Sequence, residues 1–144
     1  MSAVLNHFGH CVTDLDRSVR FYCTLFGFEE KRRLAVPDDP TSRLLQVDKP
    51  VGLNAVYLEK DGTTLELLSF DRPGNAPSRV RPFTEPGLTH LSFCVDQPAE
   101  TCALAIEFGG SVIEGTDIGP AIFIRDPDGQ PIELIVMAYR SSLT

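Results

Sequence analysis

The sequence predicts an α+β fold built from two βαβββ modules in tandem, and three observations support this prediction. Residues 5–12 and 88–95 share the pattern Leu-x-His-x-x-x-Cys-Val. Residues 61–67 and 128–134 share the pattern Asp-Gly-x-x-x-Glu-Leu. In each half the apolar residues between these motifs follow the order strand, helix, three strands. Similarity of this kind indicates a duplicated module, here at about residues 4–70 and 87–138, with a linker at about 71–87.

The first strand and the helix of each module have clear boundaries. Alternating apolar residues predict strands at 4–12 and 87–95. In the first helix Asp14 can cap the first turn and Gly27 supplies the end, with apolar residues at helical spacing between them: Leu15, Val19, Tyr22 and Phe26. The second helix has Pro98 near its first turn and ends at Gly109.

Three strand-like runs follow each helix. In the first module they cover 28–35, 42–48 together with 53–59, and 63–69; in the second they cover 111–115, 120–125 and 131–137. Asp126-Pro-Asp-Gly129 predicts a hairpin between the last two strands. Pro37-Asp-Asp-Pro40 predicts a loop, and the segment from 32 to 51 is expected to hold the extra length of the first module. The Pro- and Gly-rich linker predicts an ordered connection or a lid.

Composition excludes several functional classes. A chain of 144 residues with formal net charge −7 lacks the basic character that a nucleic-acid partner requires. It has no apolar run near the ~20 residues that a membrane span needs. The N-terminus does not resemble a secretory signal, and the four cysteines show no Cys-x-x-Cys spacing, so we expect a cytoplasmic protein with free thiols.

The repeated motifs predict a metal site. His7 and Glu66 in the first module correspond to His90 and Glu133 in the second. If a pseudo-twofold axis relates the modules, two imidazoles and two carboxylates surround one point. This donor set suits a divalent ion such as Zn, Ni, Co, Mn or Fe(II). Four protein ligands on an octahedral ion leave two adjacent positions for water or substrate, which is typical of a catalytic site.

A single strand histidine is more often structural than a ligand, and a glutamate in an apolar strand can face solvent. The repeat-related pairing favours the metal interpretation. His10 lacks this support, because its counterpart is Phe93 and it should point to the opposite face from His7. Cys11 and Cys94 should lie on the histidine side, too far along the strand to bind the same ion. Arg79 and Arg81 in the linker either hold an anionic substrate or are solvated.

Four segments together resemble the vicinal oxygen chelate superfamily, which includes glyoxalases, bleomycin resistance proteins and extradiol dioxygenases. They are His7-x6-Asp14-Leu-Asp-Arg-Ser-Val-x-Phe-Tyr-x3-Phe-Gly27, Leu65-Glu-Leu67, His90-Leu-Ser-Phe-Cys-Val-Asp96 and Asp126-Pro-Asp-Gly-x2-Ile-Glu-Leu134. The resemblance spans nearly the whole chain. It implies a single domain in which paired βαβββ modules form an open, cupped mixed sheet around a metal ion, commonly in a homodimer. In some members two chains build each site.

The His-Glu-His-Glu set is most similar to the glyoxalase I branch. That similarity implies a lyase or isomerase that moves a proton next to a metal-bound carbonyl through an enediolate-type intermediate. Its substrate would be a small oxygenated molecule. Carried over by position, Glu133 is the ligand that can loosen and act as base, and Glu66 is its repeat-related catalytic partner.

Two departures leave the substrate open. Glyoxalase I enzymes tend to carry a glutathione-binding arginine where this chain has Cys11, and methylmalonyl-CoA epimerases usually have Gln in place of Glu66. Two other classes remain as alternatives. One is an Fe(II) extradiol-type dioxygenase, which would need a further His or Tyr acid/base group. The other is a drug-binding or antibiotic-resistance protein on the same fold.

Overall fold

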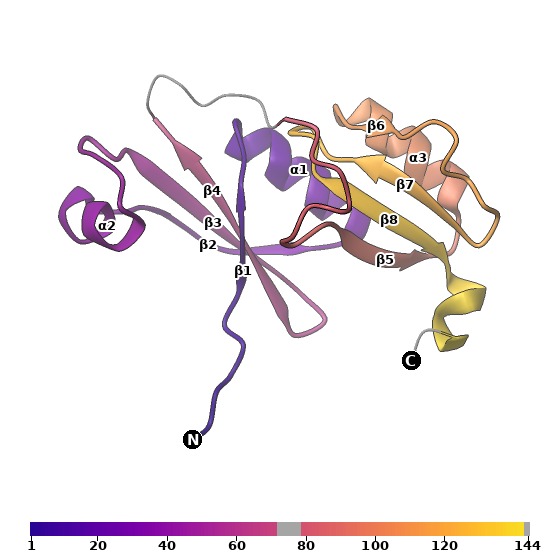
Figure 1. The fold of residues 1–144 in the computed structure, drawn as a ribbon, viewed down its shortest axis with the longest axis horizontal. Helices are drawn as coiled ribbons and strands as arrows, with labels where there is room; N and C mark the ends of the chain where they lie inside the picture. The colour runs from indigo at the N-terminus through magenta and orange to yellow at the C-terminus, as the bar shows by residue number, and fades with distance from the viewer. Residues whose placement is uncertain (72–78, 143–144) are drawn as a thin grey trace. The chain divides into compact units, whose positions relative to one another are not determined.

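The structure of the chain, a computed structural model, describes residues 1–71 and 79–142 (Figure 1). The chain divides into two compact units, Met1–Ala76 and Pro77–Thr144. Each unit contains one strand-helix-strand-strand-strand module, so the prediction of an α+β fold with two βαβββ modules in tandem is confirmed. Residues 72–78 of the predicted linker lie outside the described residues.

The first unit holds a four-stranded sheet in the order β1-β4-β3-β2. Its strands are β1 (Phe8–Cys11), β2 (Glu29–Ala35), β3 (Leu53–Lys60) and β4 (Thr63–Phe70). Strand β1 runs parallel to β4, and the other two pairings are antiparallel. The parallel pairing requires a crossover between β1 and the rest of the sheet, and helix α1 (Leu15–Phe26) begins that crossover.

The second unit repeats this topology. Its strands β5 (Leu91–Val95), β6 (Ser111–Val112), β7 (Ala121–Arg125) and β8 (Pro131–Val136) follow the order β5-β8-β7-β6, again with one parallel pair, β5 with β8. Helix α3 (Pro98–Glu107) packs against β7 and β8, and a 3-10 helix, η1 (Met137–Ser142), follows the last strand. The first strands are shorter than predicted, because residues 4–7 and 87–90 do not join the sheets.

Helix α1 has the boundaries that the sequence predicts. The Asp14 side chain accepts a hydrogen bond from the backbone N of Arg17 at 2.9 Å, which satisfies one of the free amides of the first turn. Gly27 ends the helix with φ of 69°, a left-handed conformation that other residues adopt at a cost. Tyr22 and Phe21 of α1 are fully buried, as are Leu58 and Leu67 of the sheet, and they belong to the core of this unit.

The predictions of a strand at 42–48 and of a loop at Pro37-Asp-Asp-Pro40 are wrong. Residues Asp38–Leu45 form a helix, α2, and Pro37 precedes it in an extended conformation. Pro40 fits because an amide in the first turn has no partner within a helix, so proline loses no hydrogen bond there. The Asp38 carboxylate accepts hydrogen bonds from the backbone N of Val51 and of Gly52, both at 3.2 Å, and so ties α2 to the start of β3. Helix α2 therefore accounts for much of the extra length of the first module.

The predicted hairpin between β7 and β8 is confirmed. Asp126, only 2% exposed, accepts hydrogen bonds at Oδ1 from the backbone N of Asp128 at 2.9 Å and of Gln130 at 2.8 Å. Its backbone N also donates to the carbonyl of Gln130 at 3.0 Å. The aspartate therefore builds the turn that fixes the register of β8.

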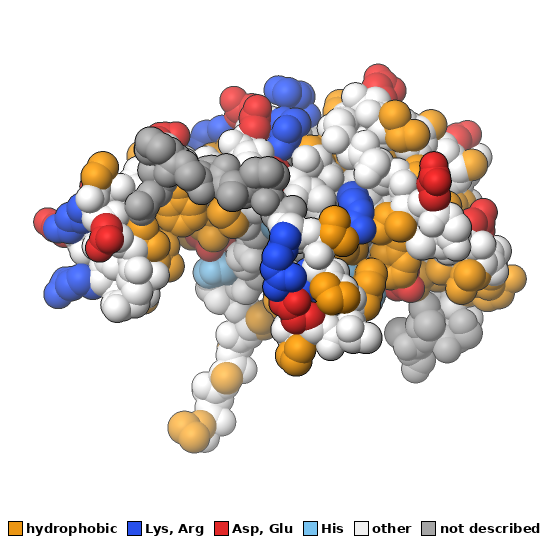
Figure 2. All heavy atoms as spheres, turned by 45° about the horizontal axis from the view of Figure 1, so that its top comes forward, with side chains coloured by type: hydrophobic (Ala, Val, Ile, Leu, Met, Phe, Trp, Pro, Cys, Tyr) orange, Lys and Arg blue, Asp and Glu red, His pale blue; other side chains and the backbone are white. Residues whose placement is uncertain are grey.

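Charge is mixed over the surface in view. Figure 2 shows basic side chains in small groups beside acidic ones over the described residues of that face. Among the described residues, no helix has both the length and the apolar character to cross a membrane.

Candidate functional site

Both predicted glutamates lie between two buried residues of a strand. Glu66 lies in β4 between Leu65 and Leu67, which are buried, and Glu133 lies in β8 between the buried Ile132 and Leu134. Because successive side chains of a strand point to opposite faces, each carboxylate lies on the face of its sheet away from the buried neighbours.

In the first unit His7 meets Glu66 just before β1 begins. The distance from His7 Nε2 to Glu66 Oε2 is 3.0 Å, and the other ring nitrogen, Nδ1, lies 2.5 Å from Oδ1 of Asn6. The pair therefore combines an imidazole held from one side with a carboxylate that is 13% exposed.

Tyr57 completes this first group of side chains. It stands on β3 directly opposite Glu66 in the register of β3 and β4, and its hydroxyl hydrogen-bonds the Glu66 carboxylate. That hydrogen bond, with a smaller contribution from burial, raises the pKa of Tyr57 above its usual value. The Tyr57 ring also meets the His7 ring edge-on, with centroids 5.8 Å apart.

In the second unit His90 and Glu133 form the equivalent pair with a looser contact. Their Nε2 and Oε2 atoms are 3.7 Å apart, and His90 Nδ1 lies 2.8 Å from the Thr89 hydroxyl. The Ser92 hydroxyl donates to Glu133 Oε2 at 2.7 Å.

Aromatic rings surround His90. Phe123 stands opposite Glu133 in the register of β7 and β8, and its ring meets His90 edge-on at 5.3 Å. Phe83, from the segment before β5, packs on Phe123 at 5.1 Å and lies 5.9 Å from His90. One side of the imidazole therefore faces an apolar wall.

Each unit therefore brings its own predicted histidine and glutamate together. Nitrogen and oxygen donors of this kind suit divalent first-row ions, so the chemistry of each pair fits half of a metal site. Within the described part of either unit, no three or more His, Cys, Asp or Glu side chains group in a way that could hold a metal ion. That the four residues share one ion stays a prediction.

His10 packs against the first helix. The His10 ring meets the Tyr22 ring of α1 edge-on at 6.1 Å, so it is part of the packing between β1 and the helix. All four cysteines are free thiols. Burial raises the pKa of Cys23 and of Cys102, which makes thiolate chemistry at these two positions unfavourable.

Both linker arginines have partners within their own segment. Arg79 forms an ion pair with Glu85 at 2.5 Å, and Arg81 donates a hydrogen bond to the carbonyl of Leu88. These contacts favour a structural role for the two residues over a substrate-binding one.

The sequence analysis missed Tyr57, Ser92, Phe83 and Phe123 as contacts of these pairs. A signal for Tyr57 exists, because the Asp61-Gly62 turn pairs β3 with β4 and so sets Tyr57 opposite Glu66. The pairing of Ser92 with Glu133 depends on the parallel register of β5 and β8, which no local motif encodes.

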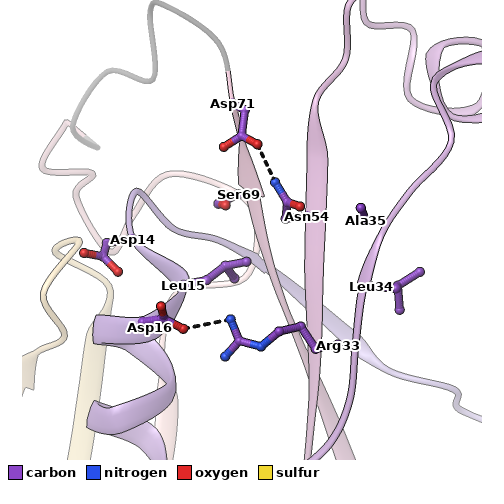
Figure 3. Close-up of a pocket in the computed structure, with 9 residues that line it drawn as sticks. All are labelled: Asp14, Leu15, Asp16, Arg33, Leu34, Ala35, Asn54, Ser69 and Asp71. Carbon is purple, nitrogen blue, oxygen red and sulfur yellow. Dashed lines mark hydrogen bonds and ion pairs between the residues drawn. The ribbon is translucent and has the colours of Figure 1, made fainter.

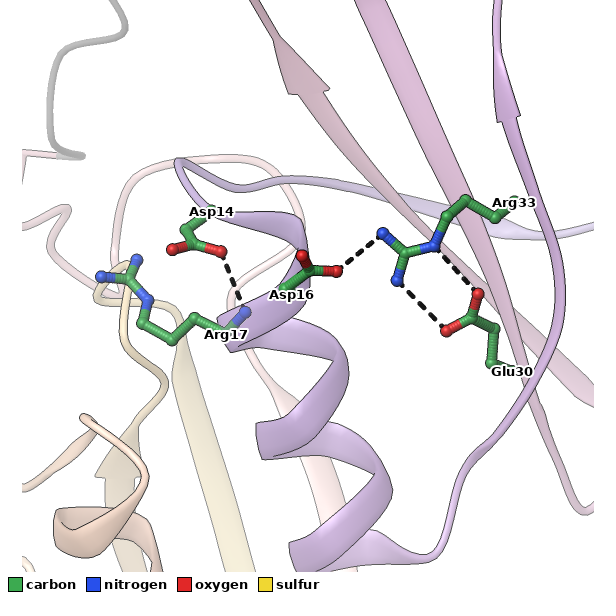
Figure 4. Close-up of polar contacts among 5 residues, drawn as sticks. All are labelled: Asp14, Asp16, Arg17, Glu30 and Arg33. Carbon is green, nitrogen blue, oxygen red and sulfur yellow. Dashed lines mark hydrogen bonds and ion pairs between the residues drawn. The ribbon is translucent and has the colours of Figure 1, made fainter.

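A cavity of about 430 Å³ also lies in the first unit, on the side of the sheet that carries α1 (Figure 3). The start of α1 and the strands β2, β3 and β4 line it. Its charged groups are already engaged: Arg33 pairs with Asp16 at 2.7 Å and with Glu30 at 3.0 Å (Figure 4), and Asn54 donates to Asp71 at 2.8 Å. The contact with Glu30 is the main reason why the pKa of Arg33 is raised. Because Ser69 and Glu66 point to opposite faces of β4, this cavity is separate from the His7–Glu66 pair.

Comparison with known proteins gives the family. The sequence profile of the glyoxalase/bleomycin resistance protein/dioxygenase superfamily matches residues 4–134. No curated protein matches the chain.

Solved structures share the fold. The trypanothione-dependent glyoxalase I of Leishmania major superposes with a TM-score of 0.69 at 24% identity, covering 99% of this chain and 92% of its own. A glyoxalase family protein from Bacillus cereus gives 0.75 at 18% identity, covering 90% and 91%. The fosfomycin resistance protein FosX from Listeria monocytogenes, in a complex with Mn(II) and sulfate, gives 0.66 at 16% identity, covering all of both chains. The profile match covers most of the chain, and with the repeated βαβββ topology it shows that this protein belongs to the glyoxalase/bleomycin resistance protein/dioxygenase superfamily.

Proposed function

We propose that the chain is a divalent-metal-dependent enzyme of glyoxalase or epimerase type, which moves a proton next to a carbonyl group of a small oxygenated substrate. The observation that carries the proposal is the repeated contact between a histidine before the first strand and a glutamate on the last strand of each module, at 3.0 Å for His7–Glu66 and 3.7 Å for His90–Glu133. Duplicated imidazole–carboxylate pairs are the donors that a shared ion requires.

The four side chains would together hold one ion of the Zn, Ni, Co, Mn or Fe(II) class. Two carboxylates balance its charge, which reduces the electrostatic cost of a partly buried site. When bound, such an ion stabilises negative charge on substrate oxygen and so makes the neighbouring C–H group more acidic. The relative FosX, whose structure contains Mn(II), supports a divalent ion on this fold.

The two glutamates have different surroundings, and this supports different roles. Glu66 contacts both His7 and Tyr57 and is 13% exposed, which suits a carboxylate that stays in place. Glu133 is 25% exposed and lies farther from its histidine, which suits a carboxylate that moves. We assign Glu133 as the base that takes the proton from one carbon and returns it to the adjacent carbon.

The packing of His10 favours this chemistry over ring cleavage by an iron dioxygenase. Such a reaction would call for a His or Tyr acid/base group beyond the ligands. The only spare histidine, His10, packs on Tyr22 of α1, and the Tyr57 hydroxyl is engaged by Glu66.

We further propose a homodimer. Strand β1 lies at one edge of the first sheet and β5 at one edge of the second, and edge strands are ready surfaces for pairing with another strand. Sedimentation of the purified protein should then give twice the chain mass of 15.8 kDa. A cytoplasmic location stays a prediction.

The test combines metal analysis with proton exchange. The protein, dialysed against Zn²⁺ or Mn²⁺, should retain about one ion for each set of two His–Glu pairs. Incubation in D2O with hemithioacetals of methylglyoxal, formed with glutathione and with smaller thiols, should then give product that carries solvent deuterium. A protein with no affinity for divalent ions contradicts the proposal, whatever its substrate.

A further inference from the structure

Each glutamate is hydrogen-bonded by a hydroxyl group. In one module the hydroxyl comes from the antiparallel neighbour of the glutamate strand, and in the other it comes from the parallel neighbour. Tyr57 reaches Glu66 from β3, the antiparallel neighbour of β4. Ser92 reaches Glu133 from β5, the parallel neighbour of β8. The hydrogen bond from a hydroxyl to the glutamate is therefore present in both modules, but the residue that donates it stands at a different position of the repeat.

The strand that carries the hydroxyl residue beside the glutamate differs between the two modules. Opposite Glu66 stand Gly9 on β1 and Tyr57 on β3. Opposite Glu133 stand Ser92 on β5 and Phe123 on β7. In each module one neighbour carries a hydroxyl and the other does not, so that each glutamate receives one hydroxyl.

We propose that Tyr57 is a positioning residue, whose hydroxyl fixes the Glu66 carboxylate in the orientation needed to bind a metal ion. This inference rests on the proposed function, since it takes Glu66 as a ligand. Ser92 donates the corresponding hydrogen bond to Glu133, whose longer distance to His90 leaves it the more mobile of the two carboxylates.

The geometry gives Tyr57 the means to do this. Its ring is held against His7 at 5.8 Å, so one side chain contacts both members of the pair. A glutamate side chain has several rotatable bonds, and a hydrogen bond from a fixed partner removes alternative orientations. Hydrogen bonds to ligating carboxylates of this kind typically contribute about 10-fold to 100-fold in metal affinity.

Gly9 offers a direct test, because the structure leaves space there for the missing hydroxyl. A Cβ atom at Gly9 would lie 3.9 Å from Glu66 Oε2 and 3.7 Å from Leu68 Cδ1, both ordinary contacts. A serine at this position would face Glu66 as Ser92 faces Glu133. Gly9→Ser should therefore replace the hydroxyl that Tyr57→Phe removes.

The experiment measures Zn²⁺ affinity by competition with a chromophoric chelator and records the absorption spectrum of the Co²⁺-loaded protein. Tyr57→Phe should weaken Zn²⁺ binding by about 10-fold to 100-fold and change the Co²⁺ spectrum. The double variant Gly9→Ser/Tyr57→Phe should recover most of the lost affinity. Tyr139→Phe, which removes a hydroxyl from the half-exposed tyrosine of η1, is the matched control and should bind as the wild type does.

The outcomes separate this inference from the proposed function. If the wild type and Tyr57→Phe bind Zn²⁺ equally, the role of Tyr57 is overturned while the metal site stands. If Tyr57→Phe loses affinity and Gly9→Ser restores none of it, the hydroxyl is not the cause and the inference also fails. If the wild type binds no Zn²⁺, the proposed function fails first and takes this role with it.

Discussion

A carboxylate between two buried neighbours on a strand is confined to one face by the pleat of the strand. Glu66 and Glu133 both lie between two such neighbours. Each contacts a histidine that comes directly before the adjacent parallel strand. The local surroundings differ, since Tyr57 and His7 hold Glu66 while Glu133 accepts from Ser92 and stands 3.7 Å from His90. The proposed function rests on this difference, with Glu66 as a fixed ligand and Glu133 as a mobile base.

The base assignment predicts the behaviour of Glu133→Gln. The amide keeps the size of the side chain and an oxygen that can accept from Ser92, so fold and much of the metal affinity should remain. It cannot accept the substrate proton, so deuterium incorporation should fall by about 10²-fold to 10⁴-fold. Exchange is measured by mass spectrometry of the product, and Glu66→Gln is the matched variant, expected to weaken metal binding instead. Undiminished exchange in Glu133→Gln would rule out this base.

The duplication singles out the four candidate residues in the sequence. The two histidines stand in one repeated motif and the two glutamates in the other. The structure brings His7 together with Glu66 and His90 together with Glu133, each pair within its own unit. Tyr57 and Ser92 escaped notice because the repeat does not conserve them: the hydroxyl that each glutamate receives comes from a different neighbouring strand. Only the register of the sheets shows that each of them stands beside a glutamate.

At the scale of elements, turns and caps determine where strands and helices begin and end. The sequence predicts α1 and the β7–β8 hairpin well because Asp14, Gly27 and Asp126 act within a few residues. It failed at α2, where two prolines suggested a loop. What holds α2 is a contact distant in sequence, from Asp38 to the amides before β3, and no local pattern reveals it.

The β7–β8 turn should depend on the Asp126 carboxylate. In Asp126→Ala the amides of Asp128 and Gln130 lose their acceptor in a partly buried turn, and we expect a loss of about 2 kcal/mol in the free energy of unfolding. Asp126→Asn keeps an acceptor oxygen and should cost less than half of that. Urea denaturation followed by circular dichroism measures both variants. Equal stability of Asp126→Ala and the wild type would show that water satisfies these amides.

The end of α1 should depend on the left-handed conformation of Gly27. Its φ of 69° costs a residue with a Cβ atom roughly 1 kcal/mol, so Gly27→Ala should lower the free energy of unfolding by about that amount. Gly9→Ala is the matched control, because a Cβ atom at Gly9 would make only ordinary contacts and the strand should tolerate a methyl group within about 0.5 kcal/mol. Similar losses in both variants would show that conformation at Gly27 is not the determining factor.

At the scale of the whole molecule, duplication gives two compact units with the same strand order, and each unit contains one histidine–glutamate pair. A shared ion would make the metal-dependent stability a property of both units together. With two separate sites, each pair would bind its own ion and each unit would have its own part of the metal-dependent stability. The distinction follows from linkage, since a ligand stabilises the folded state only through the sites that bind it.

A shared site, if the proposal holds, predicts that His7→Ala and His90→Ala each remove the whole stabilisation by metal. At about 100 times its Kd, Zn²⁺ should raise the free energy of unfolding of the wild type by about 2.7 kcal/mol, and EDTA should reverse the effect. Differential scanning fluorimetry across a Zn²⁺ series measures the shift in Tm. His10→Ala, whose ring packs on Tyr22 of α1 and should point to the opposite face of the first sheet from His7, is the control and should retain the full Zn²⁺-dependent shift even if its metal-free Tm is lower. A partial shift left in both His7→Ala and His90→Ala would mean that each pair binds metal on its own.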